Sequence, residues 1–499
     1  MDRPSERYVL PLSVRERVER DNREGLPPAA LVARLAGPKT TGVLHDAMYD
    51  AEFCSVMLEA LGRRRRLGGS GAAVVGVPVE RHRDELIEVA GLEASVARGE
   101  QSNSSVIFGG RIIVKVFRRL EEGENPDLEL VRALNEAGFE HVPKVVGSFE
   151  HRSGGAPPTT LAIAQHMVSH ESDAWNYTID ALTQFYDRVL GESRGHYDWL
   201  HATVPALSVQ SHEELPLFAR EQLGSYFDLA HLLGERTAEM HLALVADRKS
   251  PGLAPEPITQ LYQRSVHQSM RTTARRAIQL LRRSMPHLED VELMQDALSV
   301  VHAENQILER FQSVLTGRMT GMRIRCHGDY HLGQVLTTGK DVLILDFEGE
   351  PGRPVSERRI KRSALRDVAG MIRSFHYATH AAVRLQTERG LIERGSVDHD
   401  ALKHAGALWY GWVTSEFVRA YRERAGSADF MPSSDAEVDN LLDLYVLEKA
   451  AYEIGYELNF RPDWLEVPLS GMRDHLGLTG NGTGSTMRPA PRGRAVERQ

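Results

Sequence analysis

The sequence predicts an α+β protein in which a β-rich first part is followed by a mostly helical second part. Two observations lead to this prediction. Short β-branched runs separated by turn residues fill much of residues 72–168, with one helical stretch among them. From about residue 175 the apolar residues recur at helical spacing instead. The 499 residues are ample for a sizeable core and suggest about three domains or subdomains.

The first ninety residues predict a small α+β unit. A short strand is expected at Tyr8–Leu12, where Pro11 favours a sheet edge because proline has no N–H to donate. Apolar residues at helical spacing predict a helix over residues 50–61. The run AAVVGVPV at residues 72–79 predicts a second strand.

The next segment, up to residue 168, predicts a five-stranded sheet with a helix inserted after the third strand. We expect the first strand at ELIEVAG, residues 85–91. Gly109-Gly110 predicts a hairpin turn between the next two strands, because glycine accepts the positive φ that a two-residue turn requires. Asn125-Pro126 then opens the helix, with Asn125 as N-cap. KVVGSFE and TLAIAQHM supply the last two strands.

Helices are expected over most of the remaining chain. The clearest candidates are residues 227–244, 258–285, 364–388, 399–425 and 436–460. The final segment, residues 479–499, has no apolar periodicity and predicts a disordered tail.

The composition excludes several classes of protein. Apolar residues make up 41% of the chain and charged residues 26%, as in soluble globular proteins. A net charge of −9 argues against broad nucleic-acid binding. No apolar run is long enough to span a membrane, and the first residues lack a signal-peptide pattern. The only cysteines, Cys54 and Cys326, fit a reducing compartment. We therefore expect a cytoplasmic protein without nucleic-acid or membrane partners.

The strongest chemical signal lies in RCHGDYHLGQVL and the VLILDFEGE that follows. Asp329 precedes the carboxamide of Gln334 by five residues, and Asp346 ends an apolar strand. This is the spacing of a kinase catalytic loop followed by a metal-binding aspartate. Asp329 is the predicted base for a hydroxyl proton, Gln334 and Asp346 are predicted Mg²⁺ ligands, and Glu348 is a secondary candidate. A structural Asp turn before a buried strand is the alternative.

A second group of residues supports a nucleotide site. Lys115 lies on the strand after the hairpin turn, and Glu129 lies on the following helix. In kinases, a strand lysine paired with a helix glutamate places a cation on the α/β-phosphates. Residues 101–105 occupy the place of a glycine-rich phosphate loop but have small hydroxyl and amide side chains. Asp367 begins a later helix and is predicted to brace the catalytic loop rather than to react.

RCHGDYHLGQVL followed by LDFEGEP resembles the maltokinases, members of the aminoglycoside-phosphotransferase-like kinase group. The resemblance covers nearly the whole chain and is closest to the kinase portion of trehalose synthase/maltokinase fusions. It implies a bilobal, eukaryotic-like kinase fold with an N-terminal cap subdomain (1–90), a β-rich nucleotide lobe (91–168) and a helical lobe (169–478) that holds the catalytic loop and sugar site. It also implies ATP- and Mg²⁺-dependent phosphorylation of maltose to maltose 1-phosphate, on the route from trehalose to glycogen or α-glucan.

The resemblance further implies roles for individual residues. For the nucleotide, these are Lys115 with Glu129 as the phosphate-positioning pair, Ser102, Asn103 and Ser104 as the phosphate loop, and the backbone of Gln165, His166 and Met167 against adenine. For the sugar, they are His327 with Asp329 at the reacting hydroxyl, and Tyr452, Glu453, Tyr456, Arg461 and Trp464 beside the ring. An aromatic core stripe is the alternative for the tyrosines.

Two other functions stay open at this point. A kinase of the same fold could act on another sugar, for example glucosamine. A non-catalytic partner subunit of a trehalose synthase is the second alternative, and the intact set of predicted kinase residues counts against it as the sole role. An association with such a synthase remains compatible with catalysis.

Overall fold

The computed structural model describes residues 6–16, 26–37, 41–68, 71–97, 103–192, 214–350 and 352–478. They belong to two compact units, one with residues 1–257 and 321–433, the other with residues 258–320 and 434–499. The predicted tail, 479–499, lies outside the described residues. Within the described ranges, every helix is too short or too polar to cross a bilayer.

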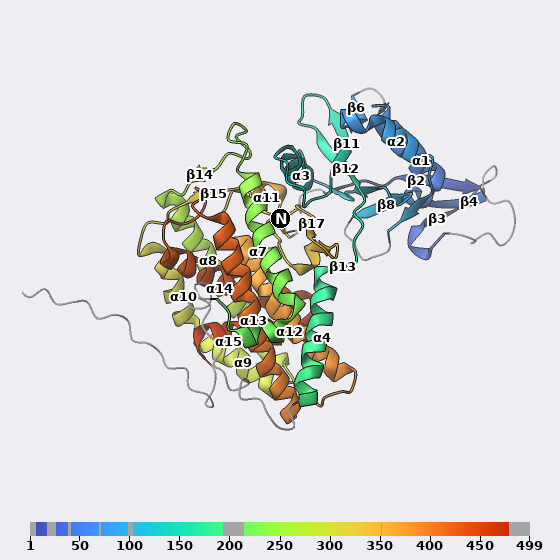
Figure 1. The fold of residues 1–499 in the computed structure, drawn as a ribbon. Helices are drawn as coiled ribbons and strands as arrows, with labels where there is room; N and C mark the ends of the chain where they lie inside the picture. The colour runs from blue at the N-terminus through green and yellow to red at the C-terminus, as the bar shows by residue number, and fades with distance from the viewer. Residues whose placement is uncertain are drawn as a thin grey trace, which may run out of the picture. The chain divides into compact units, whose positions relative to one another are not determined.

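The first unit contains a seven-stranded antiparallel sheet (Figure 1). Its strands, in spatial order, are β5 (Arg66–Gly68), β6 (Ala72–Pro78), β11 (Val145–Ser153), β12 (Thr159–His166), β9 (Ile112–Val116), β8 (Ser104–Phe108) and β7 (Ala94–Val96). The predicted hairpin is confirmed, since β8 pairs with β9 and both turn glycines, Gly109 and Gly110, have positive φ.

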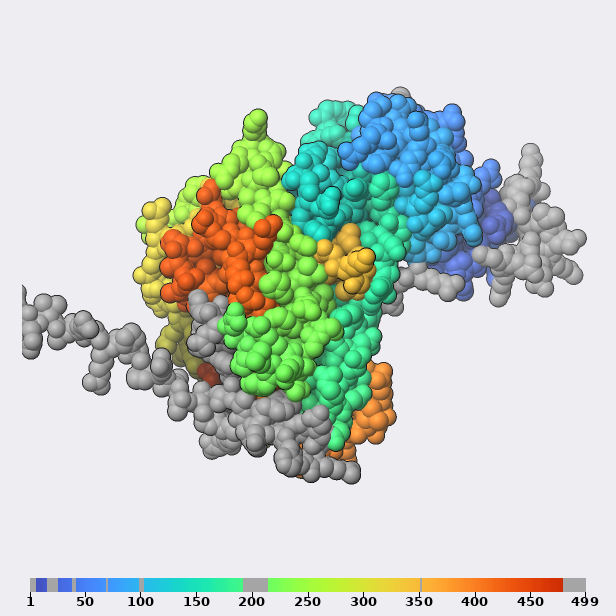
Figure 2. Space-filling view, in the orientation of Figure 1, coloured from blue at the N-terminus to red at the C-terminus, as the bar shows by residue number. Residues whose placement is uncertain are grey.

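Two helices complete the core on this sheet. The predicted helix at 50–61 is confirmed as α1 (Ala51–Gly62), and α1 packs against β6 and α2 (Arg83–Val89). Leu58 and Leu61 of α1 share a buried cluster with Phe108 and Val114 of the sheet. In Figure 2 this region, in blue, forms one continuous surface with the teal strands β11 and β12.

The predicted strand at residues 85–91 is wrong, because this segment forms most of α2. Leu86 and Val89, three residues apart, are both fully buried on one helical face. Asp84 and Glu85 occupy the first turn, where the helix dipole favours negative charge.

The sheet has seven strands instead of the predicted five. Its true edge strand in this region is β7, three residues beyond the segment 85–91, and β5 and β6 join it from the first ninety residues. The sheet therefore continues across residue 90, and the predicted domain boundaries at 90 and 168 stay predictions.

The start of the chain adds two small sheets. The predicted strand at Tyr8–Leu12 divides around Pro11 into β1 (Arg7–Tyr8) and β2 (Leu12–Glu16). β1 pairs with β10 (Arg119–Leu120), whereas β2 pairs with β4 (Thr41–Asp46), which also pairs with β3 (Leu31–Ala36). Short 3₁₀ turns, η1 (Pro28–Ala30), η2 (Ala47–Tyr49) and η3 (Glu80–His82), connect these elements.

The helix predicted after Asn125-Pro126 is α3 (Pro126–Glu136), and the Asn125 side chain caps it by accepting a hydrogen bond from the Asp127 amide. The helical part of the same unit follows. Its helices are α4 (Ala174–Glu192), α6 (Leu217–Leu223), α7 (Ser225–Leu244), α11 (Val355–Arg358), α12 (Leu365–Glu388) and α13 (Val397–Ala425). The predicted helices at 227–244, 364–388 and 399–425 are thereby confirmed.

Within this helical part, α13 packs along α7 and against α12. Short strands lie on either side of residues 324–334 and pair in two small sheets. They are β13 (Ser172–Asp173), β16 (Val335–Thr337) and β17 (Val342–Ile344) in one sheet, and β14 (Glu256–Pro257) with β15 (Met322–Arg323) in another.

Within its described residues, the regular elements of the second unit are all helices or 3₁₀ turns. It consists of α8 (Gln260–Ser284), η5 (Met285–His287), α9 (Val291–His302), α10 (Glu304–Gln312), η6 (Ser313–Leu315), α14 (Asp435–Phe460), η8 (Pro462–Trp464) and α15 (Glu466–Leu476). α8 packs along α14, and α15 packs against α9 and α14. These helices confirm the predictions for residues 258–285 and 436–460.

Candidate active site

Lys115 lies at the centre of a cluster of three carboxylates. Its Nζ is 2.6 Å from Asp346 Oδ1, 2.6 Å from Glu348 Oε1 and 3.3 Å from Asp127 Oδ2. β9 places this side chain between the sheet and the segment after β17, and only 17% of it is exposed. Burial alone would lower the pKa of Lys115, but the three carboxylates raise it well above its usual value. The side chain is therefore a buried ammonium group.

The predicted pairing of Lys115 with Glu129 is wrong, because the helix carboxylate that contacts Lys115 is Asp127. Asp127 is 2% exposed, and its second oxygen accepts a hydrogen bond of 3.0 Å from the Phe347 amide. The reason is helical geometry. Residues two apart on an α-helix are rotated by about 200° around its axis and so point to nearly opposite sides, and Glu129 therefore faces away from Lys115.

Glu129 instead joins α3 to the chain around the catalytic loop. Its Oε2 is 2.8 Å from Arg325 Nη1 and 2.9 Å from Arg359 Nη2. Arg325 is only 2% exposed and lies two residues before His327. An ion pair with a buried partner is costly to break from one side, since the remaining charge is left without compensation. Glu129 is thus a structural link between the helix and the loop.

Asp367 braces the catalytic loop, as the sequence predicts. Its two carboxylate oxygens accept hydrogen bonds from the backbone amides of His327, at 2.7 Å, and Gly328, at 3.0 Å. His241 Nε2 lies 3.1 Å from the same carboxylate. Burial raises the pKa of Asp367, but the contacts with His241 and the loop outweigh this effect and leave it below its usual value. A charged acceptor therefore fixes the start of the loop.

The rest of one α12 face follows the same loop. A Cβ on Gly370 would come within 2.7 Å of the Tyr330 carbonyl oxygen, so glycine permits this close approach. One turn further, Ser374 Oγ accepts a hydrogen bond of 3.0 Å from the Leu332 amide. Asp367, Gly370 and Ser374 have the i, i+3, i+7 spacing of one helical face. α12 is therefore the template on which the loop is laid.

Asp329, the predicted base, lies in this braced loop directly after Gly328, whose φ of 87° favours glycine. The Asp329 amide lies 3.4 Å from His327 Nδ1. The other ring nitrogen, His327 Nε2, lies 2.8 Å from the Leu345 carbonyl and must donate to it, because a carbonyl only accepts.

These contacts correct the prediction that His327 meets the sugar. The ring is 1% exposed and packs on Phe347, with ring centroids 4.6 Å apart. Both ring nitrogens already face backbone groups. We therefore assign His327 to positioning the loop and Leu345, the residue before Asp346.

The two predicted metal ligands meet in the structure. Gln334 ends the 3₁₀ turn η7 (Leu332–Gln334), and its Nε2 lies 3.2 Å from Asp346 Oδ2. Asp346 has a φ of 61°, which among the described non-glycine residues only Arg64 shares in sign. A non-glycine residue in this conformation is strained, and such strain clusters at functional sites.

The oxygen atoms at this point suit a magnesium ion. Ligand oxygens of Asp127, Asp346 and Glu348 all lie within 4.8 Å of one another, and carboxylate and amide oxygens are the ligands that Mg²⁺ prefers. Burial raises the pKa of Asp346, but Lys115 outweighs this and lowers it below its usual value. Burial and the two neighbouring carboxylates raise the pKa of Glu348 despite Lys115. The pKa of Asp346 is thus lowered and that of Glu348 raised, which makes Asp346 the more readily ionised of these two carboxylates.

The predicted phosphate loop is described in part. Ser102 lies outside the described residues. Asn103 points to the cluster, since its Nδ2 donates a 2.7 Å hydrogen bond to Glu348 Oε1. Ser104 Oγ instead accepts a hydrogen bond of 2.9 Å from Arg118 Nε. Of the described pair, Asn103 is the residue in reach of the carboxylates.

The predicted adenine contacts lie at the end of β12. Gln165 pairs with the sheet, the His166 amide donates to the Lys144 carbonyl at 2.9 Å, and the Met167 amide donates to the Arg111 carbonyl at 2.8 Å. The N–H groups of His166 and Met167 are thus engaged within the protein. An adenine contact here stays a prediction, and it would involve their carbonyl groups or the residues that follow.

The five predicted sugar residues belong to the second unit, so their relation to Asp329 stays a prediction. Tyr452, Glu453 and Tyr456 lie on α14, and Arg461 and Trp464 lie at its end and in η8. Glu453 is buried, and Tyr456 is 40% exposed. The Arg461 guanidinium lies 5.2 Å from the Tyr456 ring and 5.7 Å from the Trp464 ring. These three residues thus form one cation–aromatic group.

Sequence reasoning missed Asp127, although a signal for it existed. Asp127 stands at i of an i, i+3, i+4, i+7 stripe whose other members, Leu130, Val131 and Leu134, are all buried. A charged residue on the buried face of a helix calls for a partner inside the protein. Glu129 lies off this stripe. The same periodicity that predicts the helix could therefore have selected Asp127.

No family model matches the chain. The chain is 24% identical over 382 residues to the glucosamine kinase of Streptacidiphilus jiangxiensis, an alignment that covers 76% of this chain and 72% of that relative. It is 25% identical over 386 residues to the glucosamine kinase of Mycolicibacterium smegmatis, covering 75% and 79%.

Two solved structures that resemble this chain are also glucosamine kinases. A glucosamine kinase in complex with glucosamine, ADP and inorganic phosphate superposes with a TM-score of 0.58 at 19% identity, covering 87% of this chain and 85% of that one. A second crystal form of a glucosamine kinase gives 0.57. The predicted fold class is thereby confirmed: the chain has the α+β, bilobal kinase fold of the aminoglycoside-phosphotransferase type, with N-terminal sheets and a helical C-terminal lobe.

Proposed function

We propose that this protein is an ATP-dependent kinase that phosphorylates a hydroxyl group of a small sugar. The observation that carries the proposal is the meeting of Lys115, from the sheet, with Asp346 and Gln334, from the segment around the catalytic loop. Phosphoryl transfer needs a cation on the phosphates, oxygen ligands for magnesium and a carboxylate for the hydroxyl proton. The same small region holds candidates for all three.

The proposed reaction assigns one task to each group. Asp329 accepts the proton of the sugar hydroxyl, and the oxygen of that hydroxyl bonds to the γ-phosphorus of ATP. The bond from that phosphorus to the β–γ bridging oxygen breaks, and ADP leaves. Lys115 holds the phosphates, while Asp367 and His327 keep the loop in place. Magnesium, held by Asp346 with Gln334 and Glu348, would neutralise phosphate charge.

Glucosamine is the acceptor that the comparisons favour. Both named sequence relatives are glucosamine kinases, and the superposed kinase structure contains glucosamine and ADP. Maltose, the acceptor implied by the maltokinase resemblance, is the second candidate. It is supported by the aromatic residues around Arg461, because aromatic faces suit stacking on sugar rings. A complex with a trehalose synthase also stays a prediction, and light scattering of the mixed proteins would test it.

An acceptor screen tests the proposal. The purified protein, with ATP and Mg²⁺, is offered glucosamine, maltose and glucose, and ADP release is followed by a coupled assay. We expect turnover that depends on the sugar, with the highest kcat/KM for glucosamine. Turnover with maltose alone would overturn the choice of acceptor and leave the kinase intact. ADP release that no sugar stimulates would overturn the sugar-kinase proposal.

A further inference from the structure

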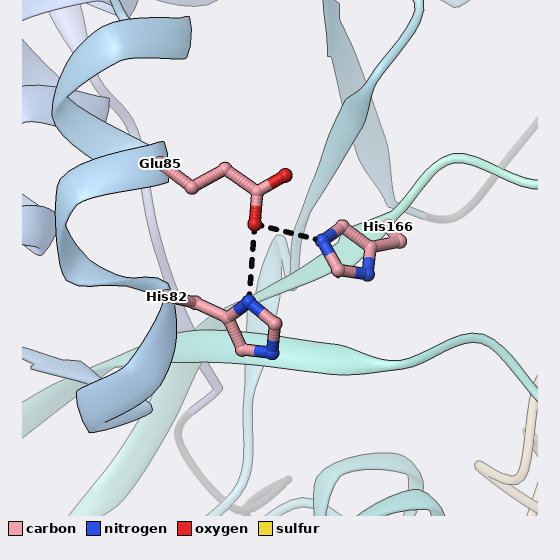
Figure 3. A group of neighbouring side chains, drawn as sticks. All are labelled: His82, Glu85 and His166. Carbon is pink, nitrogen blue, oxygen red and sulfur yellow. Dashed lines mark hydrogen bonds and ion pairs between the residues drawn. The ribbon is translucent and has the colours of Figure 1, made fainter.

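A second cluster of metal-binding side chains takes no part in the proposed phosphoryl transfer. It consists of His82, Glu85 and His166 (Figure 3). Glu85 Oε2 lies 3.0 Å from His82 Nδ1 and 3.0 Å from His166 Nε2. All three possible ligand atoms lie within 4.8 Å of one another. Figure 3 shows the carboxylate directed at both imidazole rings.

The three residues come from three elements of the first unit, of which η3 and α2 are consecutive in the chain. His82 ends η3, and Glu85, three residues later, lies in the first turn of α2, so the two side chains share one face. His166 is the last residue of β12, 81 residues further along the chain than Glu85. Its backbone completes the sheet, whereas its side chain turns to Glu85. The fold thus brings three possible ligand side chains to one point, which a metal site requires.

The donor set fits zinc. Imidazole nitrogens and a carboxylate oxygen are common Zn²⁺ ligands, and sites with three protein ligands keep a position for water. Burial lowers the pKa of His82 and outweighs the opposing hydrogen bond from Glu85, which favours the neutral imidazole. Burial raises the pKa of Glu85, but hydrogen bonds from His166 and His82 outweigh it and leave this pKa below its usual value.

The separations of the donor atoms are compatible with one bound ion. Ligand bonds of about 2.0–2.2 Å in a tetrahedron separate the donor atoms by roughly 3.3 Å, and two of the separations here are 3.0 Å. The side chains of His82, Glu85 and His166 are 14%, 25% and 28% exposed. They are therefore shielded by the fold but reachable from solvent.

Two arginines have to be accommodated. Arg81 Nε lies 3.0 Å from His82 Nε2, and a zinc-bound His82 would carry its proton on this nitrogen. Arg81 is exposed, so it can turn away at little cost. Arg111 Nη2 lies 3.6 Å from Glu85 Oε1, and its shorter contact, 2.7 Å, is to Glu88. Neither arginine is the closest partner of the Glu85 oxygen that faces both rings.

We propose that His82, Glu85 and His166 bind one Zn²⁺ ion, with water as a further ligand, and that the ion ties α2 to the end of β12. The next residue after this strand, Met167, belongs to the predicted adenine contacts. The ion would thus cross-link the helix and the sheet beside the nucleotide site without entering the reaction.

Zinc titration of the full chain tests the proposal. The protein is first stripped with a chelator and then titrated with ZnCl₂ in competition with a chromogenic chelator. We expect one equivalent to bind with submicromolar affinity and to raise the melting temperature. H82A, E85Q and H166A should each weaken binding by roughly 100-fold or more. Co²⁺ should give visible absorption bands in the wild type that H166A lacks.

Two matched controls keep the result specific. H170A removes an exposed histidine four residues after His166, and D346N alters the proposed magnesium site. Both should bind zinc like the wild type. Thermal melting in EDTA shows whether each variant folds. If the alanine variants do not fold, E85Q still tests the site, because it keeps the volume of the side chain. Wild-type zinc affinity in H82A and H166A, or no zinc binding tighter than millimolar in the wild type, would overturn the proposal. If the three residues only form hydrogen bonds with one another, the wild type will bind no zinc more tightly than millimolar.

Discussion

Replacing Asp127 by asparagine removes one negative charge beside Lys115 while keeping the shape of the side chain. The asparagine carbonyl oxygen can still accept the hydrogen bond from the Phe347 amide, so the local fold should survive. The contact that is lost is the 3.3 Å ion pair with Lys115. In the nucleotide complex that we propose, Asp346 and Glu348 would hold magnesium, and Asp127 would be the remaining carboxylate beside Lys115.

The size of the effect follows from Coulomb's law. Two unit charges 3.3 Å apart attract each other by about 5 kcal/mol at an effective dielectric constant of about 20. Most of this is offset, because the neutral amide no longer has to be desolvated as a charge. A net loss of about 1–2 kcal/mol corresponds to a roughly 5–30-fold lower kcat/KM for ATP. The expected change is a higher KM for ATP together with a lower kcat.

E129Q is the matched control, since it is an equally conservative change two residues along the same helix. It weakens the contacts with Arg325 and Arg359 but leaves the Lys115 cluster untouched. Steady-state kinetics at varied ATP, with urea denaturation of each variant, separates the two effects. We expect D127N to raise KM for ATP and E129Q to lower stability. If E129Q raises KM as much as D127N does, or D127N leaves it unchanged, the assignment of Asp127 is refuted.

Three further predictions concern the loop and the metal. D346N should flatten the Mg²⁺ dependence of the rate, since it removes the charge of a proposed magnesium ligand; an unchanged Mg²⁺ titration would count against this role. D367N leaves one buried loop amide without an acceptor and should cost about 1–3 kcal/mol in urea denaturation at pH 7. Because the folded pKa of Asp367 is lowered, its contribution is complete above about pH 4 and is lost at more acidic pH, so the gap between wild type and D367N should shrink there; a constant gap would contradict the assignment. G370A should push the Tyr330 carbonyl and lower kcat roughly 100-fold with little change in secondary structure by circular dichroism, and wild-type kcat would show that this close approach is unimportant.

Local patterns predicted most of the elements correctly. Helical spacing of apolar residues located α1, α7 and the long helices that follow. α7 and α8 each bury one regular face, whereas α13 is buried on all sides from Gly411 to Val418. The Gly109-Gly110 turn and the Asn125 cap were predictable because their chemistry is local. The error at residues 85–91 arose in a short apolar run, where helix and strand patterns are hard to distinguish.

The candidate site was predictable in its motif and not in its contacts. The spacing of Asp329, Gln334 and Asp346 follows one short stretch of chain, and the structure brings the last two together. The partner of Lys115 depends instead on which way a helix is rotated against a sheet, which a spacing argument for Glu129 could not decide. The His82–His166 cluster joins α2 to β12 across the fold, so no sequence motif marks it.

The central claim is that Asp329 serves phosphoryl transfer from ATP to a sugar hydroxyl. Phosphorus NMR of a reaction with ATP, Mg²⁺ and glucosamine tests it most directly, with wild-type protein and D329N compared at equal concentration. We predict that a sugar phosphate signal grows with the ADP signals in the wild type, and that D329N forms it several orders of magnitude more slowly although it is folded. Sugar phosphate formed at the wild-type rate by D329N would contradict the account.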